Sequence, residues 1–400
     1  MLRTLPVRAI IRAICDAADR WSDADFPPRV RVTDAIVERT GYSVPVVEYA
    51  LDQLFFSIEP QVLESTIVAE LGSLDALDGF VPRAGRPDAF ARGVDRVCIL
   101  SSRTTIGVGL VPAIFALCAK SEVTVKDRED YFIAAFFETL AEEHNAFARA
   151  ATARTWSGAE QSNDLGGFDA IVAFGKNKTL QTIREHAAPG ARFIGFGSRA
   201  SAGYITRETL HHAERARELA RGAARDLVLY ESEGCLSLHV LFAEAHDDAN
   251  VQSFLKTLAE ATQGAGLEFP IGKRDPGDVA RMAQFRAVAA FRAAGGQGAV
   301  YSDDVCSYVL VYDPPSGDPP PFAPRCLSII PVREPAQAAA YVRAHHIELE
   351  GFALSDGRRD VVESAVNAGA VRLAAFGELQ RLPVSADHGG RPRIADYIRW

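Results

Sequence analysis

The chain has 400 residues, which at ~150 residues per domain suggests two or three domains. Hydrophobic residues make up 48% and charged residues 24% of the chain, a balance that excludes a mostly disordered, coiled-coil or fibrous protein. The 52 acidic residues outnumber the 43 basic ones, so the net charge of -9 gives no overall attraction for nucleic acid.

The first 80 residues are expected to be mainly helical. Val7, Ile10, Ile11 and Ile14 recur at helical spacing, which favours an amphipathic helix over a secretion signal. No run of about eighteen apolar residues occurs, so no membrane span is predicted. We therefore expect a cytoplasmic protein.

Strands and helices then alternate up to about residue 230. Helices are predicted at 107–119, 130–150, 177–186 and 206–224, and strands at 94–100, 122–126, 170–174, 192–196 and 227–230. This alternation predicts a parallel sheet that is covered by helices on both faces. Ligands are expected at the carboxyl ends of its strands.

A second alternation follows Gly234. Helices are predicted at 247–261, 278–294, from 336 and from 359, and strands at 236–244, 308–311, 327–331, 350–354 and 371–374. The proline-rich stretch 314–324 is expected to be a stiff surface loop. The sequence thus predicts a helical segment at 1–80, two α/β domains at 81–230 and 231–375, and a tail at 376–400.

The six cysteines are scattered without a CxxC pair, which indicates reduced thiols rather than a disulfide framework. Cys235 differs from the others because it follows Gly234 between two predicted strands, at the junction of the two α/β domains. A thiolate on such a loop can reach a bound carbonyl group. A buried cysteine that acts as a small hydrophobic residue is the alternative, and it is the role expected of the other five.

Two further segments could hold a nucleotide. The small residues of 196–203 follow a predicted strand, so that backbone N–H groups there can approach a phosphate, although an ordinary strand–helix turn is the alternative. Lys126 ends a predicted strand, where its ammonium group can contact ribose or phosphate, or can simply be solvated.

The histidines give one candidate site residue and no metal site. His388 is followed by two glycines on a predicted loop, which makes it a candidate. The pairs His211-His212 and His345-His346 lack a ligand partner at a suitable spacing, so no metal is predicted. His239 follows Cys235 on a predicted strand and is either a core residue or a neighbour of the thiol.

Four stretches in this order, 104–126, 169–201, 230–244 and 368–400, carry a resemblance to a known family. They include Cys-Leu-Ser at 235–237 and the terminal pattern DHGGRP…RW. The chain from about residue 90 to its end resembles the acyl-CoA reductases related to the fatty acid reductase of bacterial bioluminescence (LuxC-type). That family belongs to the aldehyde dehydrogenase superfamily, so the resemblance implies a Rossmann-type cofactor domain, an α/β catalytic domain and a homo-oligomer.

The resemblance also implies roles for individual residues. Cys235 would take the acyl group of a fatty acyl-CoA or acyl-carrier thioester as a thioester of its own. Lys126 would contact the adenosine ribose, and Gly197 and Ser198 would line the nicotinamide side. A reduced nicotinamide cofactor, NADPH or NADH, would then reduce the acyl-enzyme to an aldehyde.

The chain departs from the family pattern at Thr104 and Thr105, where a Gly-Asn-Val-Pro type stretch is usual. The missing Asn amide would have helped to stabilise the oxyanion, and loss of one such donor can lower the rate by ~10²- to 10³-fold. We name Thr104 and His388 as candidate catalytic residues beside Cys235, and Thr105 as a candidate cofactor contact. The Glu-Leu-Gly-Gly stretch of hydrolytic aldehyde dehydrogenases is also absent, which suits a reductase.

Nearby charges and two alternative functions stay open. Glu231 and Glu233 would raise the pKa of Cys235 unless they point away from it, and Asp127 would repel a 2′-phosphate if it faced one. A binding or scaffold protein that kept the fold and lost activity is one alternative. A Cys-dependent acyltransferase without hydride transfer is the other.

Overall fold

The computed structural model describes residues 2–83, 85–102, 105–128, 131–156, 165–245, 248–312 and 319–400. Two compact units divide the chain. The first comprises Met1–Thr40, Val47–Ser198 and Pro383–Trp400, and the second comprises Gly41–Val46 and Arg199–Leu382. The division between Ser198 and Arg199 differs from the predicted boundary near residue 230, because a strand at Ala200–Ile205 that the sequence did not predict pairs with the sheet of the second unit.

Helices form the first 80 residues, as predicted. Val7, Ile10, Ile11 and Ile14 are all buried on one face of α1, which confirms the amphipathic interpretation of that segment. The elements of this region are η1 (Leu2–Thr4), α1 (Val7–Ser22), α2 (Pro27–Thr40), α3 (Val44–Phe56), α4 (Pro60–Leu71) and η2 (Leu74–Leu77).

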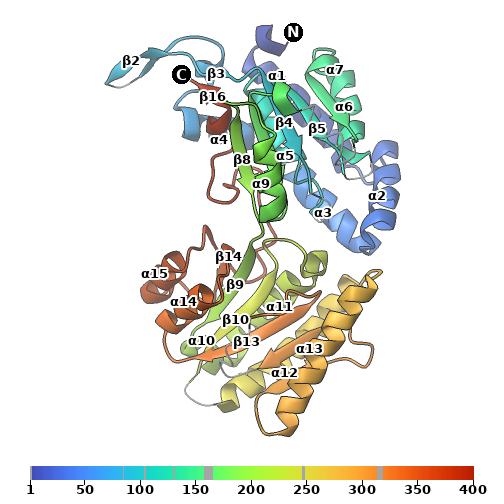
Figure 1. Ribbon diagram of the computed structural model, residues 1–400, viewed down its shortest axis with the longest axis vertical. Helices are drawn as coiled ribbons and strands as arrows, with labels where there is room; N and C mark the ends of the chain where they lie inside the picture. Colours follow the sequence, from blue (N-terminus) through green and yellow to red (C-terminus); the bar gives the residue numbers. More distant parts are fainter. Residues whose placement is uncertain are drawn as a thin grey trace. The chain divides into compact units, whose positions relative to one another are not determined.

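A five-stranded parallel sheet organises the rest of the first unit (Figure 1). Its strands lie in the order β6 (Ala151–Arg154), β5 (Glu122–Lys126), β4 (Arg96–Leu100), β7 (Ala170–Phe174) and β8 (Arg192–Phe196). Its helices are α5 (Leu110–Cys118), α6 (Phe132–Glu143), α7 (Phe147–Ala150), η4 (Leu165–Gly167) and α9 (Asn177–Glu185). The chain reverses its direction of winding between β4 and β7, which is where doubly wound sheets bind ligands at the carboxyl ends of their strands.

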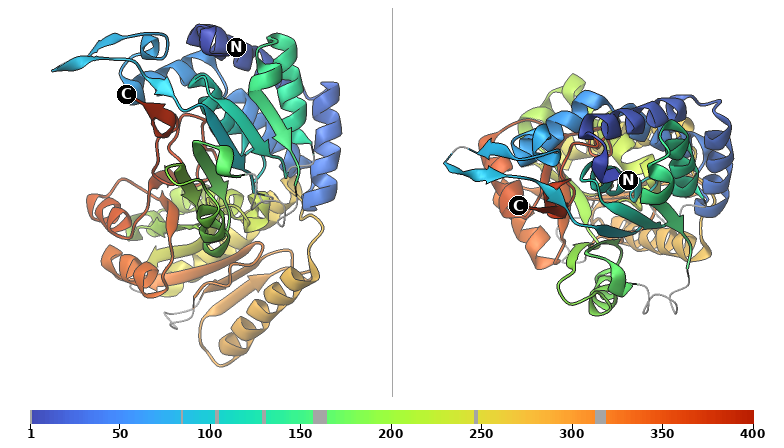
Figure 2. Two further views of the ribbon diagram at one scale, coloured as in Figure 1. Left: turned by 45° about the horizontal axis from the view of Figure 1, so that its top comes forward. Right: turned by 90° about the horizontal axis from the view of Figure 1, so that it is seen from above.

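A hairpin and the tail complete the first unit. The strands β1 (Val81–Arg83) and β2 (Arg86–Ala89) pair antiparallel in a hairpin that projects away from the five-stranded sheet (Figure 2). The short strand β3 (Arg92–Gly93) pairs with β16 (Ile398–Arg399), which follows η6 (Ala395–Tyr397). The predicted tail at 376–400 is therefore divided, since only its part from Pro383 belongs to this unit.

A seven-stranded sheet organises the second unit. Its strands lie in the order β11 (Ala299–Ser302), β12 (Val309–Tyr312), β13 (Cys326–Val332), β10 (Leu238–Glu244), β9 (Ala200–Ile205), β14 (Leu349–Leu354) and β15 (Arg372–Ala375). All pairs are parallel except β11 with β12. The helices are α10 (Arg207–His211), α11 (Ala213–Val228), η5 (Leu229–Ser232), α12 (Asp248–Glu268), α13 (Pro276–Ala294), α14 (Pro335–Ala344) and α15 (Arg359–Asn367). The first part of the predicted proline-rich loop, 314–318, lies outside the described residues.

Alternate residues of β10 face two separate apolar cores. Val240 and Phe242 pack with α14 and α15, whereas Leu241 and Ala243 pack with α11 and α12. The seven-stranded sheet is therefore covered by helices on both faces, as expected of an α/β unit. The predicted strand at 227–230 is wrong, because these residues form the end of α11 and the start of η5; a short apolar run does not distinguish a strand from a buried helix end.

Among the helices that the structure describes, none combines the length and the apolar character that a membrane crossing requires.

Candidate active site

Cys235 lies in the turn between η5 and β10 in the second unit. It is half-exposed, as is Cys306, whereas the other four cysteines are buried. A side chain of the neighbouring strand holds the turn: the Ser201 hydroxyl of β9 donates a hydrogen bond to the Cys235 carbonyl oxygen at 2.9 Å. The residue is therefore accessible while the backbone that carries it is held in place.

The electrostatic surroundings of Cys235 favour the neutral thiol. Burial and then the negative charge of Glu350 raise its pKa to about 12. The positive charge of Arg199 and hydrogen bonds from the N–H groups of Cys235 and Leu236 act in the opposite direction. Arg199 also pairs with Glu350, whose Oε2 atom lies 3.6 Å from the arginine Nε. A thiol with this pKa must lose its proton before it can attack a carbonyl carbon.

Glu350 is a residue that the sequence did not bring to attention. Glu231 and Glu233 are closer to Cys235 in the chain, but the carboxylate of Glu231 contacts Arg325 and that of Glu233 accepts a hydrogen bond from the Tyr42 hydroxyl at 3.2 Å. The carboxylate with the largest effect on the thiol comes instead from the start of β14. Glu350 is an ionisable residue in an otherwise apolar predicted strand, and this is the sequence signal that could have identified it.

His239 is a core residue, which was one of its two predicted roles. It is buried on β10, its ring centroid lies 5.1 Å from that of Phe322, and burial lowers its pKa to about 4.

The predicted cofactor residues gather at one edge of the five-stranded sheet in the first unit. Lys126 is the last residue of β5, Gly197 and Ser198 follow β8, and Thr105 comes after the end of β4. Because the strands are parallel, all of these positions lie at the carboxyl edge. Thr104 lies outside the described residues.

Gly197 allows a close approach between β8 and α9. A Cβ atom at this position would lie 2.3 Å from the Oδ1 atom of Asn177, the first residue of α9. A larger residue at position 197 would therefore require the Asn177 side chain to move.

His388 also belongs to the first unit. Its ring centroid lies 4.5 Å from that of Phe196 and 5.4 Å from that of Phe174, the last residues of β8 and β7. The structure thus places His388 with the predicted cofactor residues and assigns it to a different unit from Cys235.

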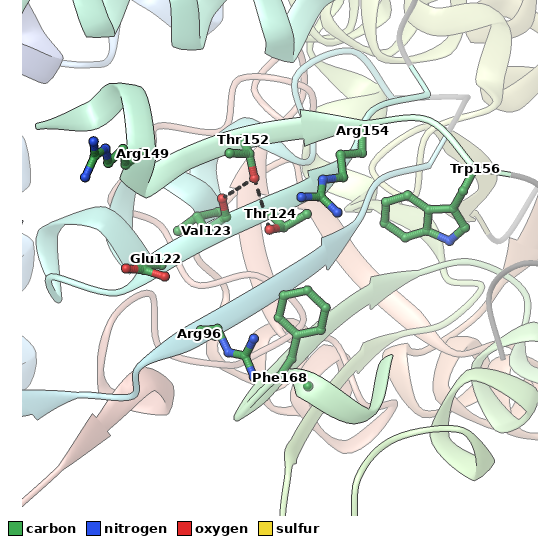
Figure 3. Close-up of a pocket in the computed structure, with 10 residues that line it drawn as sticks. Arg96, Glu122, Val123, Thr124, Arg149, Thr152, Arg154, Trp156 and Phe168 are labelled. Carbon is green, nitrogen blue, oxygen red and sulfur yellow. Dashed lines mark hydrogen bonds between the residues drawn. The ribbon is translucent and has the colours of Figure 1, made fainter. Parts of the chain in front are cut away.

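A pocket of about 310 Å³ lies against the same sheet (Figure 3). It is lined by residues from β4, β5, β6 and the segments beside them, which are Arg96, Glu122, Val123, Thr124, Arg149, Thr152, Arg154, Trp156, Gly167 and Phe168. Figure 3 shows the guanidinium group of Arg154 next to the Trp156 ring and that of Arg96 beside the Phe168 ring, with its carbon 5.8 Å from that ring's centroid. None of these residues was identified from the sequence.

The pocket suits a ligand with an aromatic base and a phosphate. Arg96, Arg149 and Arg154 make no ion pair with any carboxylate in the described ranges, and Glu122 is the one acidic residue among the lining residues. The Trp156 Nε1 atom is buried without a hydrogen-bond partner in the part of the chain that the structure describes. Cations bind phosphate oxygens, and an indole ring can stack with a base.

Trp156 links this pocket to Lys126. The Lys126 Nζ atom lies 5.1 Å from the centroid of the Trp156 ring, and Lys126 is only 7% exposed. Asp127 is buried, and its Oδ2 atom accepts a hydrogen bond from the Ala134 N–H in α6 at 3.2 Å. The Asp127 carboxylate, which could have repelled a phosphate, is thus buried and hydrogen-bonded to α6.

Comparisons with known proteins identify the family and the fold. A family model described as "Acyl-CoA reductase (LuxC)" matches residues 2–400. A curated relative, the long-chain acyl-protein thioester reductase 2 of Photobacterium leiognathi, is 19% identical over 285 residues, which cover 68% of this chain and 57% of that protein. The chain therefore spans less than two thirds of the length of this relative.

Solved structures share the fold across the whole chain. Aldehyde dehydrogenase 21 of Physcomitrella patens has a TM-score of 0.74 at 8% identity, covering 100% of this chain and 86% of that chain. The NAD-dependent benzaldehyde dehydrogenase of Corynebacterium glutamicum has a TM-score of 0.71 at 12% identity, covering 100% and 85%. The fold is thus that of aldehyde dehydrogenases, as the resemblance implied, and the chain belongs to the acyl-CoA reductase (LuxC) family.

Proposed function

We propose that this protein reduces an acyl thioester to an aldehyde with a reduced nicotinamide cofactor, through an acyl-enzyme on Cys235. The observation that carries the proposal is the placement of Cys235, a half-exposed residue on a turn that Ser201 holds at the amino end of β10. Membership of the acyl-CoA reductase family supports the reaction type. The curated relative is a thioester reductase by its description, which supports a thioester as the substrate.

The proposed reaction has two steps. The Cys235 thiol loses its proton, and its sulfur attacks the carbonyl carbon of the substrate; the bond from that carbon to the carrier sulfur breaks, and the carrier leaves as a thiol. A bound reduced nicotinamide supplies a hydride to the carbonyl carbon of the acyl-enzyme. The bond to Cys235 then breaks, the aldehyde leaves, and the sulfur regains a proton.

We propose further that the adenosine end of the cofactor lies beside Lys126 and Trp156, with Gly197, Ser198 and Thr105 along the same edge. Arg154 supports NADPH as the preferred cofactor, since its guanidinium group enters the pocket next to Trp156 and can pair with a 2′-phosphate (Figure 3).

Acylation of Cys235 is the direct test of the reaction. The protein is incubated with a long-chain acyl-CoA without cofactor, and its intact mass is measured. An added acyl mass that is lost in Cys235→Ser and kept in Cys306→Ser is the expected result, because Cys306 is the other half-exposed cysteine. Consumption of NADPH on addition of the cofactor should accompany release of the aldehyde.

Other outcomes separate the alternatives. A stable acyl adduct with no binding of NADPH or NADH would favour the acyltransferase. No adduct and no turnover in correctly folded protein would favour the binding or scaffold protein. Turnover that persists in Cys235→Ser would overturn the proposed role of the thiol.

Titration of the protein's tryptophan fluorescence, to which Trp156 contributes, tests the cofactor site without turnover. NADPH is expected to bind more tightly than NADH, and Arg154→Ala should lower the affinity for NADPH by roughly tenfold while leaving that for NADH nearly unchanged. Arg215→Ala, on the exposed face of α11 in the second unit, serves as the control and should change neither affinity. Equal affinities for the two cofactors in the unsubstituted protein would contradict the preference.

We also propose that the protein forms a homo-oligomer. The Phe80 side chain at the base of the β1–β2 hairpin is 75% exposed and that of Trp400 is 52% exposed, and the Arg83 guanidinium carbon lies 4.3 Å from the Trp400 ring centroid. Large exposed apolar side chains favour protein contacts. Light scattering should give the mass of more than one chain, and Phe80→Asp should lower it.

A further inference from the structure

Three consecutive residues before Cys235 have left-handed backbone conformations. The φ angles of Tyr230, Glu231 and Ser232 are 54°, 52° and 57°. Residues other than glycine adopt this conformation as isolated residues in most proteins, because their Cβ atom crowds the following carbonyl oxygen. Such strained backbone persists where the surrounding structure holds it, and it is concentrated at functional sites.

A buried ion pair holds the middle of this left-handed segment. Glu231 is 6% exposed and Arg325 is 1% exposed. The Arg325 Nη2 atom donates to Glu231 Oε1 at 2.9 Å, and its Nε atom lies 2.8 Å from Oε2. The same Nη2 atom donates to the Phe269 carbonyl oxygen at 2.9 Å, and Glu231 Oε1 also accepts from the Gly272 N–H at 3.2 Å. The two opposite charges therefore face each other inside the protein, joined by one hydrogen bond and the close approach of Nε to Oε2.

The backbone of Arg325 holds the end of the same segment. Its N–H group donates to the Ser232 hydroxyl oxygen at 3.1 Å, and that hydroxyl donates to the Leu227 carbonyl oxygen at 2.8 Å. Arg325 immediately precedes β13, which pairs with β10, the strand that follows Cys235. One residue therefore connects two positions of the strained segment to the sheet.

We propose that Arg325 is a positioning residue for Cys235, acting through Glu231 and Ser232. The inference rests on the proposed function, in which Cys235 is the nucleophile. Arg325 is too deeply buried to meet a substrate, so its effect is on the conformation of the backbone that presents the thiol. Without it the left-handed segment relaxes to ordinary backbone angles, and the sulfur no longer occupies one position relative to the acyl carbon. Loss of such alignment lowers rates without weakening cofactor binding.

The test compares Arg325→Lys and Arg325→Met with Arg29→Lys. Arg29 is the matched control, because it is 2% exposed and pairs with Asp52 at 2.5 Å, but it belongs to the first unit. Alkylation of each thiol by iodoacetamide is followed by peptide mass spectrometry, with Cys306 as the internal reference. Glu231→Gln, which keeps the shape of the side chain, is measured as well in case the arginine variants do not fold.

In folded Arg325→Lys the rate of Cys235 alkylation should change by roughly tenfold or more relative to Cys306, with a larger change in Arg325→Met and none in Arg29→Lys. The kcat for acyl-CoA reduction should fall while the KM for the cofactor stays within about twofold. A purely structural role would lower the melting temperature of all three variants and leave the relative alkylation rate unchanged, which would overturn the proposal.

Alkylation needs no turnover, so the result separates the two proposals. If Cys235→Ser keeps full reductase activity, the proposed function fails whatever Arg325 does. Suppose instead that Cys235→Ser is inactive, and that Cys235 in the folded variants Glu231→Gln and Arg325→Lys is alkylated at the rate of the unsubstituted protein. The positioning role of Arg325 is then overturned, and the proposed function stands.

Discussion

The hydroxyl group of Ser201 donates a hydrogen bond to the carbonyl oxygen of Cys235 at 2.9 Å. The oxygen of this hydroxyl group also accepts a hydrogen bond from the Gly351 N–H at 2.9 Å. Ser201 is on β9 and Gly351 is on β14, so one buried hydroxyl joins two strands to the turn that carries the thiol. The position of Cys235 thus depends on the pairing of strands that are far apart in the sequence.

Ser201→Ala should destabilise the second unit by about 2 kcal/mol, because it leaves a buried N–H and a carbonyl group without this partner. Urea unfolding measures the loss. Ser364→Ala is the control, since the Ser364 hydroxyl also donates to a backbone carbonyl, that of Pro335 at 2.6 Å, but is only half-buried. Equal losses in the two variants would contradict a special role for Ser201.

Glu350→Gln should lower the pKa of Cys235 below its present value of about 12, because it removes a negative charge that opposes the thiolate. At a fixed pH below the pKa, each unit of decrease raises the thiolate fraction about tenfold. The pH profile of Cys235 alkylation measures the change. Glu348→Gln replaces an exposed carboxylate two residues away and should leave the pH profile of Cys235 alkylation unchanged. A higher pKa of Cys235 in Glu350→Gln would refute the argument.

Asp226→Asn should weaken the dependence of the free energy of unfolding on pH. Asp226 is fully buried, and burial raises its pKa from 3.8 to about 7, although its Oδ2 atom accepts a hydrogen bond from the Gly377 N–H at 2.7 Å. Because the folded state holds the proton more tightly, this residue's contribution to stability is complete below the unfolded pKa and is lost as the pH rises through the folded pKa.

The expected slope between these two pKa values is about 1.4 kcal/mol per pH unit from this residue. The free energy of unfolding of Asp226→Asn relative to the unsubstituted protein should therefore increase from about pH 4 to pH 7 and then level off. Denaturant unfolding at a series of pH values measures it. Glu363→Gln, which replaces an exposed acid on α15 of the same unit, should show no such trend.

Glu70→Ala should detach the tail from the first unit. The two carboxylate oxygens of Glu70 accept hydrogen bonds from the backbone N–H groups of Arg393, Ile394 and Ala395 at 2.7, 2.9 and 2.9 Å. Their loss should destabilise the unit by about 3 kcal/mol, since each bond to a charged group is worth ~1.5–3 kcal/mol and water replaces part of it.

Hydrogen exchange of the tail amides, which should become faster, measures the detachment. Glu64→Ala on the same helix removes a surface contact with Arg8 at 3.7 Å and should leave the tail protected. Unchanged protection in Glu70→Ala would contradict this role.

Regular elements with a clear apolar pattern were predictable from the sequence. The helix α1 was found from the helical spacing of its apolar residues, and β4, β5 and β7 were found as short apolar runs that alternate with predicted helices. The strand β9 was missed because its residues, Ala-Ser-Ala-Gly-Tyr-Ile, are mostly small, yet all six are buried. A side chain at Gly203 would meet the Phe376 ring at 2.6 Å, which explains the small residues and needed the structure to be seen.

The amino-acid sequence was enough to establish the α/β class and the alternation of elements, and it nominated Cys235 and Lys126 as site residues. The charges that surround these two residues became visible only in the folded chain. They are Glu350 near the thiol, Arg325 paired with Glu231 before the thiol's turn, and Arg154 and Arg96 in the pocket that is lined by Trp156, whose ring lies against Lys126. Periodicity reports burial within one segment, whereas electrostatic neighbours are set by the order in which distant strands pair.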